Sequence, residues 1–258
     1  MSEAFLVALP VFNEQDHVSD VLDHVVRYSS NILVVDDGST DATAELLAGR
    51  DDVSVVRHET NLGYGAALRR GFEYAVQKKF DVLVTIDCDG QHQPQRIPEF
   101  VEACRVKDEC GRRPDIVSGS RYLKSFVGDS APPVERRQIN MQITEELNER
   151  LSLNLTDAFC GFKAYRVAAL SKLQTTDPGY AMPLELWALA AYSRLRIVEL
   201  PVPRVYLEEK RSFGGELDNG ASRLDYYHRL IEDTLQRIKS DSGHDDRKVL
   251  CGEGTGRR

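Results

Sequence analysis

The chain has 258 residues, of which 41% are hydrophobic and 29% charged, and its formal net charge is −8. This composition is typical of a soluble globular protein and excludes a disordered or fibrous chain. The acidic balance argues against a nucleic-acid partner, which would require clustered lysine and arginine, so any anionic ligand must be held locally.

The first 120 residues alternate short β-branched runs with amphipathic helical patterns. Apolar residues recur at helical spacing from Val18 to Val26, and Ser39 and Thr40 are expected to cap the next helix. This alternation predicts a mostly parallel sheet with helices on both faces. The expected strands are 4–9, 31–37, 53–58, 81–86 and 115–120, and the expected helices are 18–26, 39–47 and 65–76.

The second half of the chain is less regular and contains no internal repeat. The expected order is helix 132–151, strand 161–166, helix 183–195, strand 196–202, a Gly-rich loop 211–220 and helix 222–238. From residue 240 onward the sequence lacks periodicity and is rich in Gly, Asp and Arg. We therefore expect one domain over 1–239 and a disordered tail at 240–258.

The five cysteines are odd in number and form no Cys-x-x-Cys pair. Neither a disulfide framework nor a zinc site is indicated, and the reducing cytoplasm is the expected location. No stretch approaches the roughly 20 apolar residues that span a bilayer, and no signal peptide precedes the first apolar run. The sequence thus predicts a chain without a membrane anchor.

Polar clusters follow all five expected strands of the first half, and the carboxyl ends of parallel strands are where such folds bind ligands. Asp87 and Asp89 follow the fourth strand and form the only Asp-x-Asp of the chain. Residues two apart in an extended segment point the same way, so these carboxylates and Gln91 would face one ligand. Cys88 would then turn into the core. Spacing alone leaves a metal site and a solvated loop equally open.

Six ordered motifs between about residues 4 and 235 resemble family 2 glycosyltransferases with the GT-A fold, and most closely those that use polyprenyl or dolichol phosphates. The motifs are ALPVFNE, VVDDGSTDAT, NLGYGAALRRGF, DCDGQHQP, GSRY and DAFCGFKAYR. The resemblance implies an α/β, Rossmann-like GT-A domain with a nucleotide-sugar-binding half, about 1–121, followed by an acceptor half, 122–239. It also implies an inverting transfer of a hexose from a UDP- or GDP-sugar.

A cation is expected because charge develops on the nucleoside diphosphate as it leaves. Mg²⁺ and Mn²⁺ prefer oxygen ligands, and the resemblance implies Asp87, Asp89 and Gln91 as the metal ligands. Asp87 would also contact the donor, and Asp89 would be essential for catalysis. His92 follows a completed ligand set and is expected to position other groups rather than bind the metal.

The resemblance places Pro10, Phe12 and Glu14 in the nucleoside pocket, with Asp37 bonded to base or ribose. Two simpler roles stay open. Asp37 could close an Asx turn, and Glu14 could be a favourable charge in the first turn of a helix.

Gly63 and Gly65 open a helix, where their backbone amides could approach the diphosphate. The segment lacks a complete Gly-x-Gly-x-x-Gly and follows the third strand. A dinucleotide-binding dehydrogenase is therefore not indicated.

Arg121 and Arg136 match positions where the family directs arginines toward phosphate, and Arg211 lies in a loop that could close as a lid. Solvated surface charge is the alternative for these arginines. Asp157 precedes the Gly-Phe turn, where an inverting transferase would hold a catalytic base; a turn or N-cap role is the alternative. A base is required only for a hydroxyl acceptor, because a phosphate monoester is already ionised near pH 7.

We therefore expect a glycosyltransferase with a polyprenyl phosphate acceptor, located in the cytoplasm or at the inner face of the membrane. The helical stretch 134–151 has only Ile139, Ile143 and Leu147 as an apolar stripe, which leaves a soluble hydroxyl acceptor or a membrane-bound partner chain open. The alternatives of other classes are a nucleotide-sugar-binding protein without turnover and a sugar nucleotidyltransferase. The latter requires a Gly-rich basic loop where this chain has PVFNE.

Overall fold

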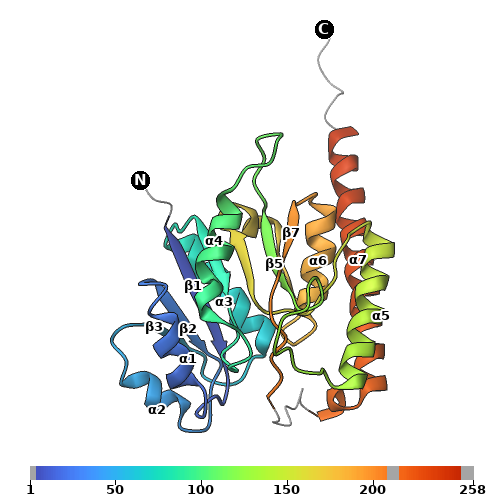
Figure 1. Ribbon diagram of the computed structural model, residues 1–258. Helices are drawn as coiled ribbons and strands as arrows, with labels where there is room; N and C mark the ends of the chain where they lie inside the picture. Colours follow the sequence, from blue (N-terminus) through green and yellow to red (C-terminus); the bar gives the residue numbers. More distant parts are fainter. Residues whose placement is uncertain (1–3, 208–214, 251–258) are drawn as a thin grey trace.

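The computed structural model describes residues 4–207 and 215–250, and these residues form a seven-stranded sheet between two layers of helices (Figure 1). The strand order is β3-β2-β1-β4-β6-β5-β7, and β6 alone runs antiparallel to both of its neighbours. The predicted mostly parallel α/β sheet is confirmed. The strands are β1 Phe5–Val11, β2 Ile32–Asp36, β3 Ser54–Arg57, β4 Val82–Thr85, β5 Ile116–Ser120, β6 Lys163–Arg166 and β7 Ile197–Pro201.

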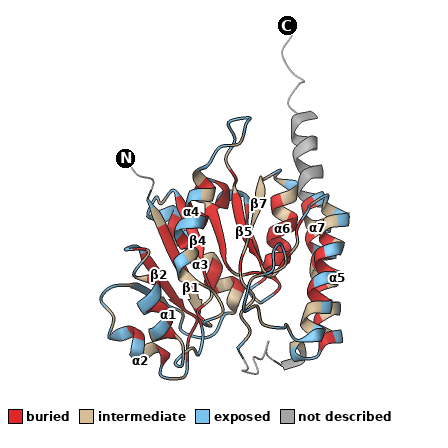
Figure 2. Ribbon diagram, in the orientation of Figure 1, coloured by how far each residue is buried: buried red, intermediate tan, exposed pale blue. Residues whose placement is uncertain are grey.

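Each face of the sheet has its own hydrophobic core, because successive strand residues point to opposite sides. In β1, Val7 and Leu9 pack with one set of helices, while Leu6 and Ala8 pack with the other. Figure 2 shows the buried residues on both layers facing the sheet. The first set is α1 Val18–Val25, α2 Thr43–Ala48 and α4 Ile97–Arg105; the second is α3 Tyr64–Gln77, α5 Val134–Leu151, α6 Met182–Tyr192 and α7 Gly220–Leu250. Three short 3₁₀ helices connect them: η1 Pro94–Arg96, η2 Val167–Lys172 and η3 Gly215–Asp218.

Several helix boundaries differ from the predicted ones. The second helix begins at Thr43, whose backbone N–H donates to Asp41 Oδ1 at 2.9 Å, and Ser39 Oγ instead accepts a hydrogen bond from Asn13 N at 3.0 Å. The predicted caps at 39 and 40 are therefore wrong. The last helix continues to Leu250, past residue 240 where a disordered tail was predicted, and 251–258 lie outside the described residues.

Helix α4 was not predicted, although its sequence carried the signal. Ile97, Phe100, Val101 and Cys104 recur at helical spacing and are all buried. Their side chains pack in the same core as β4, which α4 follows. The polar segment 87–96 precedes this helix and was interpreted only as the end of a strand.

The apolar stripe of α5 serves the core of the domain. Ile139, Ile143 and Leu147 are buried in the same cluster as α6 and α7. The stripe is therefore not available to a membrane. Among the described residues no helix has the length and apolarity needed to cross a bilayer.

The antiparallel direction of β6 matters for function. The parallel strands β1, β4 and β5 end at one edge of the sheet, whereas β6 begins there. The segment 157–162 that leads into β6 is thereby brought to the edge where residues 10–16, 87–92 and 121–122 emerge.

Candidate active site

A cavity of about 680 Å³ lies at this edge of the sheet, a size typical of small-molecule sites. Ten of the predicted site residues line it: Pro10, Phe12, Glu14, Asp37, Gly63, Asp87, Asp89, Gln91, Arg121 and Arg136. Gly65 and Asp157 do not line it, and Arg211 lies outside the described residues.

The acidic and the basic side chains that line the cavity come from different parts of the sequence. All of the lining carboxylates precede residue 90, and the lining arginines begin at residue 121. We refer to Glu14, Asp16, Asp37, Asp87 and Asp89 as the acidic side of the cavity, and to Arg121, Arg136 and Arg223 as the basic side. The cavity thus offers carboxylates to a cation and guanidinium groups to an anion.

Asp87 is fixed in place by hydrogen bonds to both of its carboxylate oxygens. Tyr64 donates its hydroxyl to Oδ1 at 2.9 Å, and His92 Nε2 lies 3.1 Å from Oδ2. Burial raises the pKa of Asp87, but the hydrogen bonds from His92 and Tyr64 outweigh burial, and the pKa lies below its usual value. Asp87 is therefore ionised, and His92 holds one of its carboxylate oxygens.

Gly161 is a site residue that sequence analysis did not identify. A Cβ atom at this position would overlap the carboxylate of Asp87, so a side chain here would displace it. The glycine of the Gly-Phe turn therefore makes room for the Asp87 carboxylate.

Asp89 and Gln91 continue from Asp87 along the rim of the cavity. The backbone amide of Gln91 donates to Asp89 Oδ1 at 3.0 Å, while Cys88 is buried in the core, as predicted. Across the described residues, no three His, Cys, Asp or Glu side chains gather closely enough to enclose a metal ion. Two carboxylates and an amide oxygen suit a hard cation that retains water and substrate phosphate as its other ligands.

Asp37 anchors a loop with the oxygens that were expected to bind a nucleoside. Its Oδ1 lies 2.6 Å from His58 Nδ1 and accepts from Leu62 N at 3.0 Å, and its Oδ2 accepts from Gly63 N at 2.7 Å. The neighbouring Asp36 also bonds to the backbone of this loop, because its Oδ1 accepts from Ser39 N, three residues further on, at 2.9 Å.

Glu14 lies at the cavity before a helix rather than inside one. Its carbonyl accepts hydrogen bonds from His17 N and Val18 N, and α1 begins only at Val18. The alternative of a first-turn helix charge therefore does not apply.

A neighbouring loop leaves no room for a side chain at either of the two glycines at the start of α3. Gly63 has φ = 102°, and a Cβ here would overlap the carbonyl of Pro178, while a Cβ on Gly65 would overlap that of Asp177. Ala66 N donates to the Pro178 carbonyl at 3.1 Å. Gly65 is therefore packed beneath this loop and away from the cavity, contrary to the prediction of diphosphate contact.

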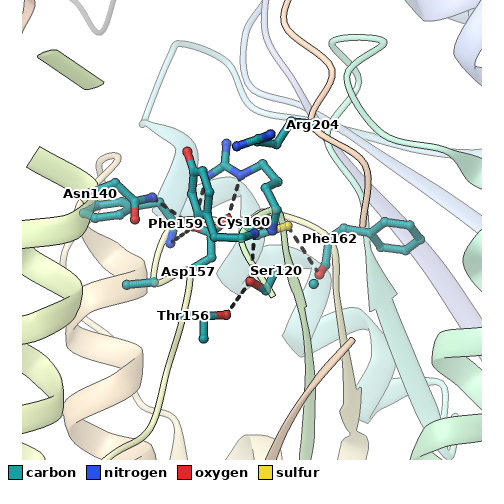
Figure 3. A network of polar contacts seen from close by, with 12 residues as sticks. Ser120, Asn140, Thr156, Asp157, Phe159, Cys160, Phe162 and Arg204 are labelled. Carbon is teal, nitrogen blue, oxygen red and sulfur yellow. Dashed lines mark hydrogen bonds and ion pairs between the residues drawn. The ribbon is translucent and has the colours of Figure 1, made fainter. Parts of the chain in front are cut away.

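Asp157 is completely buried and forms an ion pair with Arg121. Figure 3 shows the network of polar contacts around Asp157. Arg121 donates from Nε to Oδ2 at 2.6 Å and from Nη2 to Oδ1 at 2.9 Å, and Asn140 Nδ2 donates to Oδ1 at 2.9 Å. Burial raises the pKa of Asp157, but the charge and hydrogen bonds of Arg121 lower it to about 2. The expected catalytic base is thus a buried counter-charge, which holds Arg121 toward the cavity.

The backbone of the loop that carries Asp157 is held by the side chain of Glu199. Glu199 accepts hydrogen bonds from Thr156 N at 2.8 Å and from Asp157 N at 3.1 Å. Burial raises the pKa of Glu199. Since Glu199 belongs to β7, the position of Arg121 depends on the edge of the sheet.

Several aromatic and polar residues of the cavity were missed by sequence analysis. Tyr64 stacks on Tyr180, with ring centroids 5.5 Å apart, and Arg121 Nη1 donates to Tyr206 at 3.4 Å. Tyr64 lies within the NLGYGAAL motif, but the prediction assigned a role only to the glycines of that motif. The loops at 180 and 206 contain no motif that indicates a site.

Comparisons with known proteins agree with this geometry. A sequence model of glycosyl transferase family 2 matches residues 6–174. An undecaprenyl-phosphate mannosyltransferase of Micrococcus luteus is 32% identical over 81% of this chain and 88% of that protein. A polyprenol monophosphomannose synthase of Mycolicibacterium smegmatis is 30% identical over 76% of each chain.

Among solved structures, glucosyl-3-phosphoglycerate synthase of Mycobacterium tuberculosis, in complex with Mn²⁺, UDP and its product, aligns with a TM-score of 0.64 and 20% identity. The alignment covers 92% of this chain and 80% of that one, which establishes a shared fold. The chain belongs to glycosyl transferase family 2 and is a glycosyltransferase with the GT-A fold.

Proposed function

We propose that this glycosyltransferase moves a hexose, with inversion, from a UDP- or GDP-sugar to the phosphate of a polyprenyl phosphate. The observation that carries this proposal is the burial of Asp157 behind Arg121. The basic side of the cavity therefore offers guanidinium groups, which suit a phosphate acceptor and cannot serve as a base for a hydroxyl acceptor.

The acidic side of the cavity supports binding of the donor with a divalent cation. Asp87 and Asp89 would hold Mg²⁺ or Mn²⁺ with Gln91 beside them, and the cation would offset the charge on the leaving diphosphate. Without it, two carboxylates and a diphosphate would repel one another at close range. Tyr64 and His92 hold Asp87 in a single orientation, which reduces the reorganisation needed on binding.

The basic side supports an acceptor that is already charged. A phosphate monoester is ionised near pH 7, so its oxygen can attack the anomeric carbon without first losing a proton. Arg121 and Arg136 would orient this oxygen and offset its charge. Asp157 is then a positioning residue, because it acts through Arg121.

Exposed apolar side chains near the basic side support a lipid-linked acceptor. Leu123, Val127, Val134 and Met141 are all exposed in the segment between β5 and the middle of α5. Such side chains can enter the interfacial region of a membrane without spanning it. We propose that this segment brings the cavity to the inner face of the membrane, where the phosphate of a polyprenyl chain is presented.

Product analysis tests the proposal. The protein is incubated with farnesyl phosphate and each of a panel of UDP- and GDP-hexoses, with Mg²⁺, Mn²⁺ or excess chelator, and products are identified by mass spectrometry. We expect a farnesyl phosphate hexose from one class of donor, formed only with a divalent cation. Transfer only to soluble hydroxyl acceptors, or binding of donors without any product, would contradict the proposal.

A further inference from the structure

Arg223 is a basic residue of the cavity to which neither the sequence motifs nor the proposed function assigns a role. It lies in the first turn of α7 and lines the same cavity as Arg121 and Arg136. Its side chain is only 4% exposed. A guanidinium this deeply buried requires hydrogen-bond acceptors and a counter-charge.

Two groups hold Arg223 in place. Nη1 donates to the carbonyl of Leu217 at 2.9 Å, and Nη2 lies 3.2 Å from Glu135 Oε2. The Glu135 side chain is 63% exposed, so solvent screens this ion pair. A better buried anion could therefore replace Glu135 at little cost.

Glu135 also brings the starts of two helices together. A Cβ on Gly220 would overlap the Glu135 carboxylate, so the start of α7 lies directly against the side chain of Glu135 in α5. Because Arg136 follows Glu135 directly, the contact that places Arg223 at the cavity also places Arg136 there.

Tyr227, one helical turn after Arg223, belongs to the same cavity as both arginines. It lines the cavity, and burial raises its pKa to about 12 although the charges of Arg223 and Arg136 lower it. Arg121, the third arginine of the cavity, is paired with the buried Asp157.

We propose that Arg223 binds the acceptor phosphate together with Arg136 and Arg121, and that Glu135 is the counter-charge that the phosphate replaces. This inference rests on the proposed function, since it concerns the same acceptor. Arg136 and Arg223 both line the cavity, and their two guanidinium groups would match the two negative charges of a phosphate dianion. Glu135 keeps the basic side compensated until the acceptor arrives.

The two partners of this ion pair should respond to substitution with opposite signs. Arg223→Gln removes one charged contact and should raise the Kd for farnesyl phosphate by about 10- to 100-fold, an effect that weakens in high salt. Glu135→Gln removes the competing carboxylate and should lower the same Kd several-fold. A purely structural role for the pair would weaken binding in both variants.

Two further variants separate charge from packing. Arg223→Lys retains the charge but not the planar fork, so it should recover part of the lost affinity. Arg229→Gln changes an exposed arginine of the same helix that does not line the cavity, and it should leave the Kd unchanged. Thermal melting of each variant reports whether the fold is intact.

The experiment is calorimetric titration of the wild type and the four variants with farnesyl phosphate, with farnesol as the uncharged probe. Weaker binding in Arg223→Gln, tighter binding in Glu135→Gln and no difference among the variants for farnesol would support the inference. An unchanged Kd in Arg223→Gln, or changes of the same sign in both charge variants, would overturn it. If the wild type makes product from farnesyl phosphate while Arg223→Gln binds it normally, this inference fails and the proposed function stands.

Discussion

The acidic and basic sides of the cavity hold their charges in different ways. Asp87 and Asp89 lie two residues apart on one segment, and no lysine or arginine lines their side of the cavity. On the basic side, Arg121 and Arg223 come from separate parts of the chain, and each is paired with a carboxylate of the protein. Under the proposed function the acidic side takes up a divalent cation with the donor, whereas Arg121 and Arg223 are compensated by carboxylates of the protein.

Under the proposed function, this difference in charge would distinguish the donor from the acceptor. A diphosphate is repelled by the acidic side unless a divalent cation accompanies it. A phosphate monoester is attracted by the basic side without a metal. Substitutions that change one side should therefore affect one substrate and spare the other.

The largest effect is expected from Asp89→Asn, which removes one of the two carboxylates that would hold the cation. Turnover should fall on the order of 10²- to 10³-fold, because the charge on the leaving group is no longer offset. The Kd for farnesyl phosphate and the melting temperature of the variant should equal those of the wild type. Initial rates across a Mg²⁺ titration measure the loss, with Asp51→Asn, an exposed aspartate outside the cavity, as the control. Full turnover of the wild type in excess chelator would contradict a metal-dependent acidic side.

Gly161→Ala should disturb the acidic side without changing its charge. The new methyl group would overlap the Asp87 carboxylate and displace it, and a displacement of about 1 Å can reduce turnover about 100-fold. Overpacking should also cost about 1 to 3 kcal/mol of stability. Kinetics and chemical unfolding measure the two effects, with Gly49→Ala at an open helix end as the control. Normal turnover in Gly161→Ala would show that Asp87 need not occupy this position.

Arg136→Gln should affect the basic side alone. We expect the KM for farnesyl phosphate to rise about tenfold in a salt-sensitive manner, while the donor KM stays constant. Arg137→Gln is the matched control, because Arg137 does not line the cavity and stacks instead on Tyr122. A rise in the donor KM of Arg136→Gln would break the division between the two sides.

The smallest effect should be the dependence of the acceptor reaction on pH. The second pKa of a phosphate monoester is about 6, so kcat/KM for farnesyl phosphate should fall about twofold between pH 7 and pH 6. Asp157 does not titrate here: its pKa is lowered to about 2, so the stability it contributes is lost only as pH falls well below 4. The same profile is expected in Asp157→Asn, whereas a flat profile would argue against a dianionic acceptor.

The sequence predicted the acidic side better than the basic side, for a physical reason. Asp87, Asp89 and Gln91 occupy alternate positions after a strand, and local geometry is enough to bring them together. Arg223 reaches the cavity only because α7 packs beside α5, a contact between residues about 88 positions apart. Nothing local to Arg223 indicates this contact.

The contacts of Asp157 and Gly65 could not be predicted for a similar reason. Motif matching identified both as important positions, but not what each contacts. The burial of Asp157 depends on Arg121 and Asn140, and that of Gly65 on the carbonyl of Asp177. The overall fold was easier to predict, because alternating strands and helices leave few arrangements, although they did not reveal that β6 is antiparallel.

Under the proposed function, the enzyme uses no protein base because its acceptor is already charged. The Asp157→Asn variant is the most direct test of this mechanism. The substitution should lower the free energy of unfolding by about 3 kcal/mol, because Arg121 loses a buried counter-charge. Under conditions where the variant is folded, the account predicts that kcat with farnesyl phosphate falls less than about tenfold. A fall of about 10²- to 10⁴-fold in kcat, with stability and the KM of both substrates unchanged, would show that Asp157 is the base and contradict the account.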